Sequence, residues 1–524
     1  MKRLLFVLSG NTLRFAYVVL FGVSLNAIMA VADPLVMKLL IDEGLVKKNY
    51  ELFAVFAALA VLFGVGMRGI LLVYELISQK LKNSVTESLT LRMFKAYFET
   101  PYAKVASSDS GYFISRIYDE PANVGQSVIT AVVGLLVSVV TFAAALSISL
   151  YLTWKITLFL CFVVPALYYL ANQFKPKIKA ASERENEEEA RLREVLGKSV
   201  DSFKTVRVFG LFPPVYRRAH ERLESYLGVL YERFKASANY QTLSAIWLSF
   251  AEVLVIVAAG WEVVAGNLSI GGLFAFMSTF WKVIGAATAV VGQVPEMSRL
   301  SVGIDRLAEF ERSARHAEKS GSENIELDNV SFGYNGTSVL DRLNLKIGTN
   351  ERVLIVGPNG SGKTTLGHLV TGFLEPSEGI VKAPSLERIS AMLSPFYFAP
   401  GSLKDNVNYE QISQPKRTLF WELAGVLGLE RKVEADAASG LSEGEKKKGQ
   451  ILMTLLKDAD IYVFDEPLAN IDVESRDAII KTQLEYTRGK TVISIMHGDE
   501  KYHRLFDRVV VLKQQIGVPV LAKC

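Results

Sequence analysis

Long uncharged hydrophobic runs dominate the first 300 residues of the chain. A helix needs about 20 apolar residues, at about 1.5 Å each, to cross a hydrocarbon core of about 30 Å. The pattern predicts six membrane spans, at residues 13–41, 51–78, 126–152, 155–174, 239–265 and 272–296. A large buried helical core is the alternative explanation, and uncharged runs of this length argue against it.

The polar segments between the spans differ in length. Residues 42–50, 153–154 and 266–271 are predicted turns, whereas residues 79–125 and 175–238 are long, polar and helix-periodic and hold about 20 Lys and Arg residues. Basic residues mark the cytoplasmic side of a membrane protein, so the N-terminus and everything after Glu296 are expected to be cytoplasmic. The Glu- and Arg-rich stretch Glu183–Glu194 is predicted to be a solvated helix that extends a span into the cytosol.

Seven charged residues lie inside or at the margins of the predicted spans. A charge at the bilayer centre costs about 2.5–3.5 kcal/mol on insertion. Such a side chain is therefore expected to face a partner or a water-filled cavity. Arg68 and Glu75 are two helical turns apart on one face, so they either line a polar pathway or mark the end of the second span. As a set, these residues favour a water-filled cavity between helices: Asp33, Lys38, Arg68, Glu75, Glu252, Glu262 and Lys282.

Composition removes several classes of protein. The chain is 50% hydrophobic and 21% charged, against about 25% charged in ordinary soluble proteins. Its two cysteines, Cys161 and Cys524, exclude a disulfide scaffold, and a net charge of +4 gives no footprint for nucleic acid. Residues 1–32 could be read as a signal peptide, but Arg14 falls where the apolar region of such a peptide should be.

The pattern changes after residue 312. Residues 1–312 are predicted to form a membrane domain with six helices and two long cytoplasmic loops, and the polar, Gly-containing segment 313–323 is predicted to be a linker. From residue 324 to 524, short apolar runs alternate with helical segments, which predicts an α/β domain with a mostly parallel sheet. The predicted strands are Val353–Val356, Ile461–Phe464, Val492–Ile495 and Val509–Leu512.

A phosphate-binding loop follows the first of these strands. The run fits G-x-x-x-x-G-K-[ST] and consists of Gly357, Pro358, Asn359, Gly360, Ser361, Gly362, Lys363, Thr364 and Thr365. Its glycines allow the backbone N–H groups to surround phosphate, Lys363 would neutralise the β- and γ-phosphates of a nucleotide, and Thr364 would coordinate Mg²⁺. A strand before the loop and a helix after it make a chance match improbable.

A second acidic motif follows about a hundred residues later. The apolar strand Ile461–Phe464 ends in Asp465 and Glu466. Asp465 is placed to hold Mg²⁺, and Glu466 would orient and polarise the attacking water. Together with the phosphate-binding loop, this pair is strong evidence for a site that binds nucleotide and Mg²⁺ and activates water.

The sequence resembles the ATP-binding cassette (ABC) family, specifically exporter-type half-transporters with six spans and one nucleotide-binding domain. Tyr334 matches the aromatic residue that stacks on adenine, and Leu441–Glu445 occupies the position of the family's LSGGQ signature. The resemblance implies that Ser442 and Gly444 contact ATP held by the opposite subunit, that Asp472 lies in the D-loop, and that His497 contacts the γ-phosphate. The fold class expected is an all-α six-helix transmembrane domain followed by an α/β P-loop NTPase domain.

The membrane half carries the resemblance too. Segments near residues 32–42, 152–157 and 204–210 look like exporter sequence. The resemblance implies that the two long loops carry coupling helices that dock on the ATPase domains. Tyr112–Asn123 and Leu211–Arg222 are the expected docking segments.

The chain departs from the family at two motifs. Glu443 and Glu445 replace a glycine and a glutamine of the signature, and Ser394 stands near the position of the family's Q-loop glutamine. A carboxylate beside a triphosphate is unfavourable unless it points away or pairs with a base. The lysines at 446–448 could offset these acids or form a solvated helix face.

These features predict ATP-driven export of a small or peptide-like substrate by alternating access, with ATP and Mg²⁺ as cofactors. The partners expected are the bilayer and a second half-transporter, in a homodimer, which we favour, or in a heterodimer with one degenerate ATP site. The expected location is a bacterial-type inner or plasma membrane with the ATPase domain in the cytoplasm. The alternatives are a flippase for lipids or polysaccharide intermediates, a siderophore importer with the exporter fold, and an ATP-gated channel.

Overall fold

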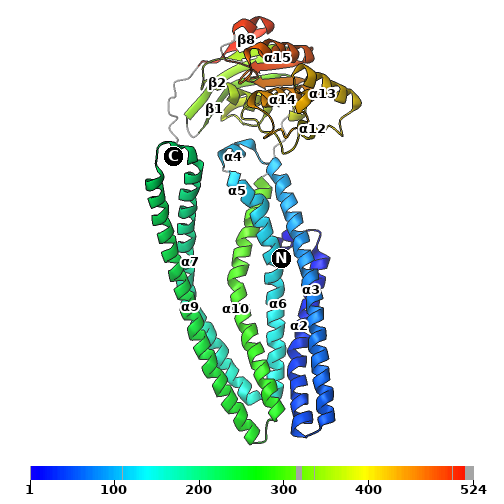
Figure 1. Cartoon of the computed structure of the whole chain (residues 1–524), viewed down its shortest axis with the longest axis vertical. Helices are drawn as coiled ribbons and strands as arrows, with labels where there is room; N and C mark the ends of the chain where they lie inside the picture. Colours follow the sequence, from blue (N-terminus) through cyan, green and yellow to red (C-terminus); the bar gives the residue numbers. More distant parts are fainter. Residues whose placement is uncertain (1, 109, 314–321, 335–336, 498–499, 514–524) are drawn as a thin grey trace. The chain divides into compact units, whose positions relative to one another are not determined.

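A computed structural model describes residues 2–108, 110–313, 322–334, 337–497 and 500–513. The chain divides into two compact units (Figure 1). The first unit is Met1–Lys95 with Ile114–Glu311, and the second is Ala96–Phe113 with Arg312–Cys524. A segment from the first of the long polar loops therefore belongs to the unit that holds the C-terminal half. Most of the predicted linker, residues 314–321, lies outside the described residues.

The first unit is built from helices. Their bounds are α1 Lys2–Val7, α2 Thr12–Leu39 with a π-helical end at Leu40–Val46, α3 Tyr50–Phe98, a π-helical turn at Ser115–Asp119, α6 Glu120–Leu152, α7 Trp154–Asp201, α8 Phe203–Val208, α9 Phe212–Val264 and α10 Ile270–Ser313. The final residues of α3 and α10 extend into the second unit.

Five helices in the described part of the chain are long and apolar enough to cross a membrane. They comprise the predicted first, second, third, fifth and sixth spans, at Thr12–Val46, Tyr50–Phe98, Gly111–Leu152, Phe212–Val264 and Ile270–Val290. The predicted fourth span, residues 155–174, lies within α7, which runs unbroken from Trp154 to Asp201 but is not one of the five. Its apolar stretch includes residues 160, 161 and 164, whose side chains are not described.

The long polar segments are mostly continuations of the spanning helices. The stretch Glu183–Glu194 lies inside α7, as predicted, and carries the ion pair Arg193–Glu189 at 2.6 Å. α7 packs along α9 through contacts that run in opposite directions on the two helices. These contacts join Phe174 to Tyr240, Glu185 to Arg233 and Glu188 to Ser225.

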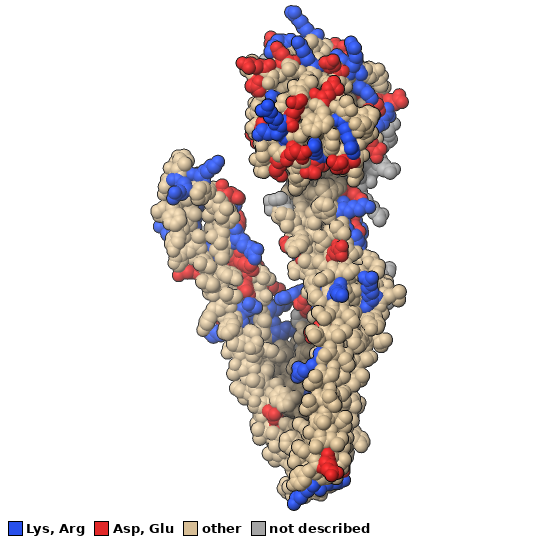
Figure 2. All heavy atoms as spheres, turned by 45° about the vertical axis from the view of Figure 1, so that its right-hand side comes forward, with Lys and Arg blue, Asp and Glu red and all other residues tan. Residues whose placement is uncertain are grey.

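Most of the charged residues in the predicted spans have polar partners within the first unit. Lys282 donates to Asp33 at 3.0 Å, and Lys155 pairs with Glu262 at 3.0 Å. The indole N–H of Trp281 donates to Glu252 at 3.0 Å. On the face drawn in Figure 2, long stretches of these helices carry few charged side chains. Such a surface suits contact with lipid tails.

The second unit contains two sheets. An antiparallel sheet has the order β2–β1–β4, with β1 Ile325–Tyr334, β2 Thr337–Ile347 and β4 Glu378–Lys382. A parallel sheet has the order β5–β6–β7–β3–β8, with β3 Arg352–Val356, β5 Ile389–Met392, β6 Ile461–Asp465, β7 Thr491–Ile495 and β8 Arg508–Val511. The predicted parallel sheet is thus confirmed, and the antiparallel sheet is an addition to it.

Helices and buried side chains surround the parallel sheet. The longer helices are α11 Lys363–Thr371, α13 Gln414–Val426, α14 Glu443–Leu456 and α15 Val473–Tyr486, and the short helices are α4 Tyr102–Ser107, α5 Ser110–Ile114 and α12 Leu403–Asn406. Every residue of β6 and of β7 is buried. Strands covered on both faces read as continuous apolar runs, which is why these strands could be recognised in the sequence.

Candidate nucleotide-binding site

The predicted catalytic motifs meet at one edge of the parallel sheet. β7 lies between β6 and β3, and all three strands run in the same direction. In register, Ile495 pairs with both Ile355 and Asp465. The phosphate-binding loop after β3, the acids at the end of β6 and His497 after β7 therefore follow adjacent carboxyl ends, where α/β proteins bind ligands.

The phosphate-binding loop has the backbone that its glycines predict. Gly360 and Gly362 have φ values of 80° and 86°, in the left-handed region that glycine adopts readily. Lys363, the first residue of α11, is buried, and its ammonium group donates to the carbonyls of Gly357 at 2.8 Å and Pro358 at 2.9 Å. The lysine side chain therefore folds back over its own loop, where its ammonium group can bind an anion.

Asp465 lies in a fully buried position at the end of β6. Its carboxylate bonds to the Thr364 side chain and accepts a 3.4 Å hydrogen bond from the backbone N–H of Ser394, while Oδ1 has no partner in the described part of the chain. Burial raises the pKa of this carboxyl, and the neighbouring Glu466 carboxylate adds to the rise. A buried carboxylate oxygen without a partner, beside a threonine hydroxyl, is a suitable donor set for Mg²⁺.

Glu466 and His497 lie next to this carboxylate edge. Glu466 has a φ of 50°, and its backbone N–H donates to the carbonyl of Ile495 at 2.9 Å. Left-handed backbone in a non-glycine residue is costly and gathers at functional sites. His497 is exposed two residues after the end of β7. Both residues thus follow strands whose carboxyl ends lie at this edge of the sheet.

The residues of this edge fit a nucleotide with its metal ion. Ser361 contributes a buried hydroxyl without a partner among the described residues, next to the buried Lys363. Bound ATP would supply a terminal phosphate whose hydrolysis drives the reaction. The loop backbone and Lys363 would hold the phosphates, and Thr364 and Asp465 would hold the metal ion.

Comparison with known proteins decides the family. Residues 16–286, more than half of the chain, match the ABC transporter transmembrane region, and residues 340–469 match the ABC transporter ATPase region. The chain belongs to the ABC transporter family. It is an integral, multi-pass membrane protein of the exporter half-transporter kind, with a C-terminal ATPase domain that hydrolyses ATP to drive transport.

Similar transporters cover nearly the whole chain. An ATP-dependent lipid A-core flippase of Desulfotalea psychrophila is 22% identical over 95% of this chain and 92% of its own length. An uncharacterised ABC transporter ATP-binding protein of Bacillus subtilis, YwjA, is 24% identical over 91% of this chain and 88% of its own. The ATP-dependent permease MDL1 of Candida albicans is 24% identical over 80% of this chain and 66% of its own.

The altered signature of this transporter forms a helix cap. Ser442 is the N-cap of α14, and its hydroxyl accepts from the backbone N–H of Glu445. In return, the Glu445 carboxylate accepts from the backbone N–H of Ser442 at 2.8 Å and from its hydroxyl at 2.9 Å. These bonds lower the pKa of Glu445. The carboxylate therefore occupies the helix N-terminus, where the family would bind phosphate.

Each lysine after the signature is associated with a different acidic group. Lys446 pairs with Glu443 at 2.8 Å, and Lys448 lies 3.9 Å from Asp472. Lys447 interacts electrostatically with Asp465 and Glu466, although burial lowers its pKa overall. The lysines therefore do more than cover a solvated helix face. No motif or spacing in the sequence indicates that Lys447 interacts with the acids at the end of β6.

The remaining predicted site residues lie at the margins of the site. Tyr334 ends β1, is 46% exposed and contacts Phe332 edge to face. Asp472 is the N-cap of α15 and accepts from the backbone N–H of Ser475 at 2.9 Å. A Cβ at Gly444 would come within 3.1 Å of the Asn470 carbonyl, so the signature lies against the D-loop. In the described part of the chain, the Ser442 hydroxyl bonds only to Glu445.

A helix from the first long loop packs on the ATPase domain. The ring of Tyr102, in α4, stacks on His368 of α11 at 5.1 Å and lies 5.3 Å from Phe373. Tyr102 lies upstream of the expected docking segment Tyr112–Asn123, whose first two residues belong to the same unit. Docking by that segment stays a prediction. The other expected segment, Leu211–Arg222, lies in the first unit. Tyr102 follows Pro101 and is not part of a periodic apolar pattern, so the sequence does not predict this contact.

Proposed function

We propose that this transporter exports a small or peptide-like substrate by alternating access in a dimer of half-transporters. The observation that carries the ATP-driven part is the sheet edge at which Lys363, Thr364 and the partnerless Asp465 Oδ1 converge. The same chain supplies the membrane helices, so one polypeptide provides both the motor and a share of the pathway. Two such chains would complete a transporter.

The catalytic roles follow from the positions of the side chains. Glu466 would orient and polarise the attacking water, and His497 would contact the terminal phosphate from the end of β7. Tyr334 would stack on the adenine ring, which suits its exposed position at the end of β1. Asp472, Ser442 and Gly444 would lie at the interface with the second subunit, which completes each site.

We favour a homodimer. Each chain has the complete set Lys363, Asp465, Glu466 and His497. Glu443 and Glu445, the acids of the signature, are paired or hydrogen-bonded by their own helix and by Lys432, which reduces their repulsion of a nucleotide. A heterodimer, in which this signature faces a degenerate site, is the alternative. We place the ATPase domain in the cytoplasm, because the pattern of spans puts it on the same side of the membrane as the two long basic loops.

A flippase is the second candidate function. Its support is the similarity to lipid A-core flippases, at 22% identity over 95% of the chain. Reconstituted transporter that moves labelled lipid between leaflets on addition of ATP, but does not move peptide-like solutes, would favour this candidate.

The central test of the proposed function is Glu466→Gln in the purified transporter. ATP turnover should fall by about 10²–10⁴-fold, because the water loses its polarising base, while nucleotide binding stays intact. Glu474→Gln, an exposed glutamate in the first turn of α15, is the matched control and should leave turnover unchanged. Undiminished hydrolysis in Glu466→Gln would remove the role given to that residue.

A further inference from the structure

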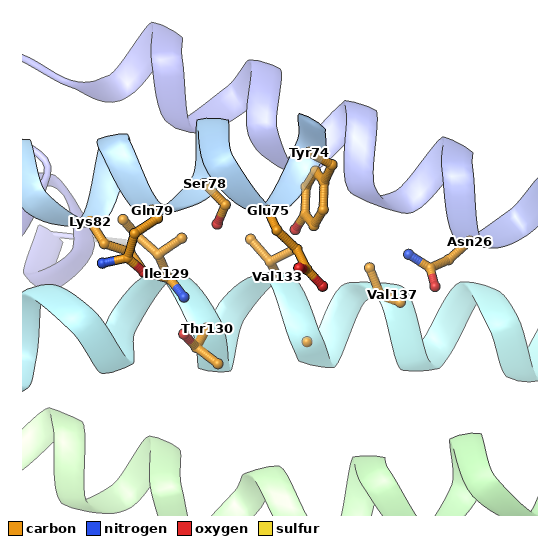
Figure 3. Close-up of a pocket in the computed structure, with 11 residues that line it drawn as sticks. Asn26, Tyr74, Glu75, Ser78, Gln79, Lys82, Ile129, Thr130, Val133 and Val137 are labelled. Atoms are coloured by element: carbon orange, nitrogen blue, oxygen red, sulfur yellow. The ribbon is translucent and has the colours of Figure 1, made fainter. Parts of the chain in front are cut away.

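A cavity with both polar and apolar lining lies between the helices of the first unit. It has a volume of about 470 Å³ and is lined from α2, α3 and α6 (Figure 3). A second cavity of about 430 Å³ shares Lys82 and Thr130 with the first and extends to α10 at Gln293 and Glu296. Each is of the size that binds small ligands, about 300–1,000 Å³. Because they share lining residues, the two cavities form one region whose lining is partly polar and partly apolar.

We propose that this region binds a short zwitterionic peptide, or a solute of the same chemistry, with its ammonium group at Glu75 and its carboxylate at Lys82. This inference rests on the proposed export function and names the substrate class for it.

Two charged residues, Glu75 and Lys82, line the first cavity. Among the residues that the structure describes, neither Glu75 nor Lys82 has an oppositely charged group within 4.0 Å. The charged residues of the neighbouring helices are different, since Lys282 pairs with Asp33 and Lys155 pairs with Glu262. An uncompensated carboxylate in a spanning helix is expensive unless it faces water or a ligand. Figure 3 shows the Glu75 side chain in the space between α3 and α6.

The spacing of the charges sets the length of the ligand. Glu75 and Lys82 are seven residues apart on α3, which places them on one face with a rise of about 10.5 Å between them. An extended chain spans about 3.3–3.6 Å per residue, so a tripeptide covers about 10 Å. A zwitterionic phospholipid headgroup carries its two charges only a few bonds apart and cannot reach both side chains.

Amide side chains occupy the wall between the two charges. Gln79 donates to Asn83 at 2.9 Å and to Gln126 at 3.2 Å, and the Thr130 hydroxyl lies on the facing helix α6. Carboxamides offer both donors and acceptors, which is the pattern that a peptide backbone requires. The lining also contains Ile129, Val133 and Val137 of α6. It therefore offers polar contacts to a peptide backbone and apolar contacts to small side chains.

Direct binding to nucleotide-free, full-length transporter in lipid nanodiscs tests the inference. The probes are radiolabelled trialanine, N-acetyl-trialanine and trialanine amide, followed by equilibrium dialysis. Trialanine should bind saturably, and removal of either terminal charge should weaken binding about tenfold, as expected for the loss of one charge-assisted hydrogen bond.

Single variants assign each terminus to its side chain. Glu75→Gln should weaken trialanine binding and abolish the difference between trialanine and its acetylated form, and Lys82→Gln should do the same for the amide. The matched controls are Glu87→Gln and Lys80→Gln, which change residues of α3 outside both cavities. Size-exclusion chromatography and the thermal unfolding midpoint of each variant verify that the transporter is folded.

The outcomes separate the inference from the proposed function. Absence of saturable binding, or equal binding of all three probes, would overturn the peptide site even if ATP turnover is normal. Competition by phosphatidylethanolamine at the same site would overturn it in favour of a lipid headgroup. Loss of ATP-dependent transport in a protein that still discriminates between the probes would instead contradict the proposed function.

Discussion

Lys447 is the residue whose surroundings differ most from what its sequence neighbours suggest. It lies in a run of three lysines, yet it is partly buried and interacts with Asp465 and Glu466 at the end of β6. A lysine beside these carboxylates supplies part of the positive charge that a metal ion would otherwise bring. The lysine and the metal ion should therefore compete for the same negative charge.

We expect Lys447→Gln to increase the apparent affinity for Mg²⁺. The concentration of Mg²⁺ that gives half-maximal ATPase activity at fixed ATP should fall about threefold to tenfold, which corresponds to about 1 kcal/mol of charge–charge interaction. Lys446→Gln is the matched control, because Lys446 pairs with Glu443 instead. Equal half-saturation in both variants would show that Lys447 has no influence on the metal.

At the residue scale, the sequence was sufficient wherever a motif has fixed spacing. Lys363, Asp465 and Glu466 could be placed because a loop, a strand and their order define them. Lys447 and Tyr102 could not, because their partners are brought together by the packing of α14 and α4 against other elements. A contact between residues distant in sequence leaves no periodic trace in either segment.

At the scale of elements, the N-terminus of α14 explains the unusual signature. Glu445 forms a reciprocal capping box with Ser442, a role that glutamine can also fill. Glutamate and glutamine can therefore both form the capping box. The negative charge of glutamate, however, weakens the attraction of this helix N-terminus for phosphate.

We expect Glu445→Gln, combined with Glu443→Gly, to raise the ATPase activity of the purified homodimer several-fold, because two negative charges near the bound phosphate are removed. Glu445→Ala should instead lower the stability of the domain by about 1 kcal/mol, since the capping bond is lost. Activity assays with thermal unfolding distinguish the two effects. Unchanged activity in the double variant would argue against a weakened signature.

The elements themselves were predicted unevenly. Four of the five parallel strands were predicted, and burial on both faces explains the continuous apolar runs of β6 and β7, such as Ile461–Phe464. The fifth, β5, was not predicted. The antiparallel strands β1 and β2 were not predicted. Their pairing contains register shifts between Leu327 and Val330 and again near Phe332, which break the alternation of polar and apolar residues.

At the scale of the whole molecule, α4 is the link between the long helix α3 and the ATPase domain. Tyr102 packs on His368, in the helix that begins with Lys363, and on Phe373, which follows the C-cap of that helix. Burial lowers the pKa of His368, so the ring in this contact is neutral near pH 7. The rings therefore connect the phosphate-binding helix α11 to α4, the helix that follows α3 in the chain.

We expect Tyr102→Ala to retain basal ATP hydrolysis and to lose most of the substrate-dependent transport, because the aromatic contact between α4 and α11 is removed. Hydrolysis and uptake measured in the same proteoliposomes check this. Tyr118→Ala, an exposed tyrosine in the segment first expected to dock, is the control and should transport normally. Equal loss in both variants would contradict the special position of Tyr102.

The order of synthesis imposes a delay on the second unit. Tyr102 leaves the ribosome roughly 270 residues before its partner His368, and the strand β8 comes later still. At about 5–20 residues per second, the aromatic face of α4 waits tens of seconds for the domain on which it packs. The membrane helix α3 is complete long before that. A newly made transporter thus acquires its helices first and its connection to the motor last, so a chain that stops early inserts without becoming an ATPase.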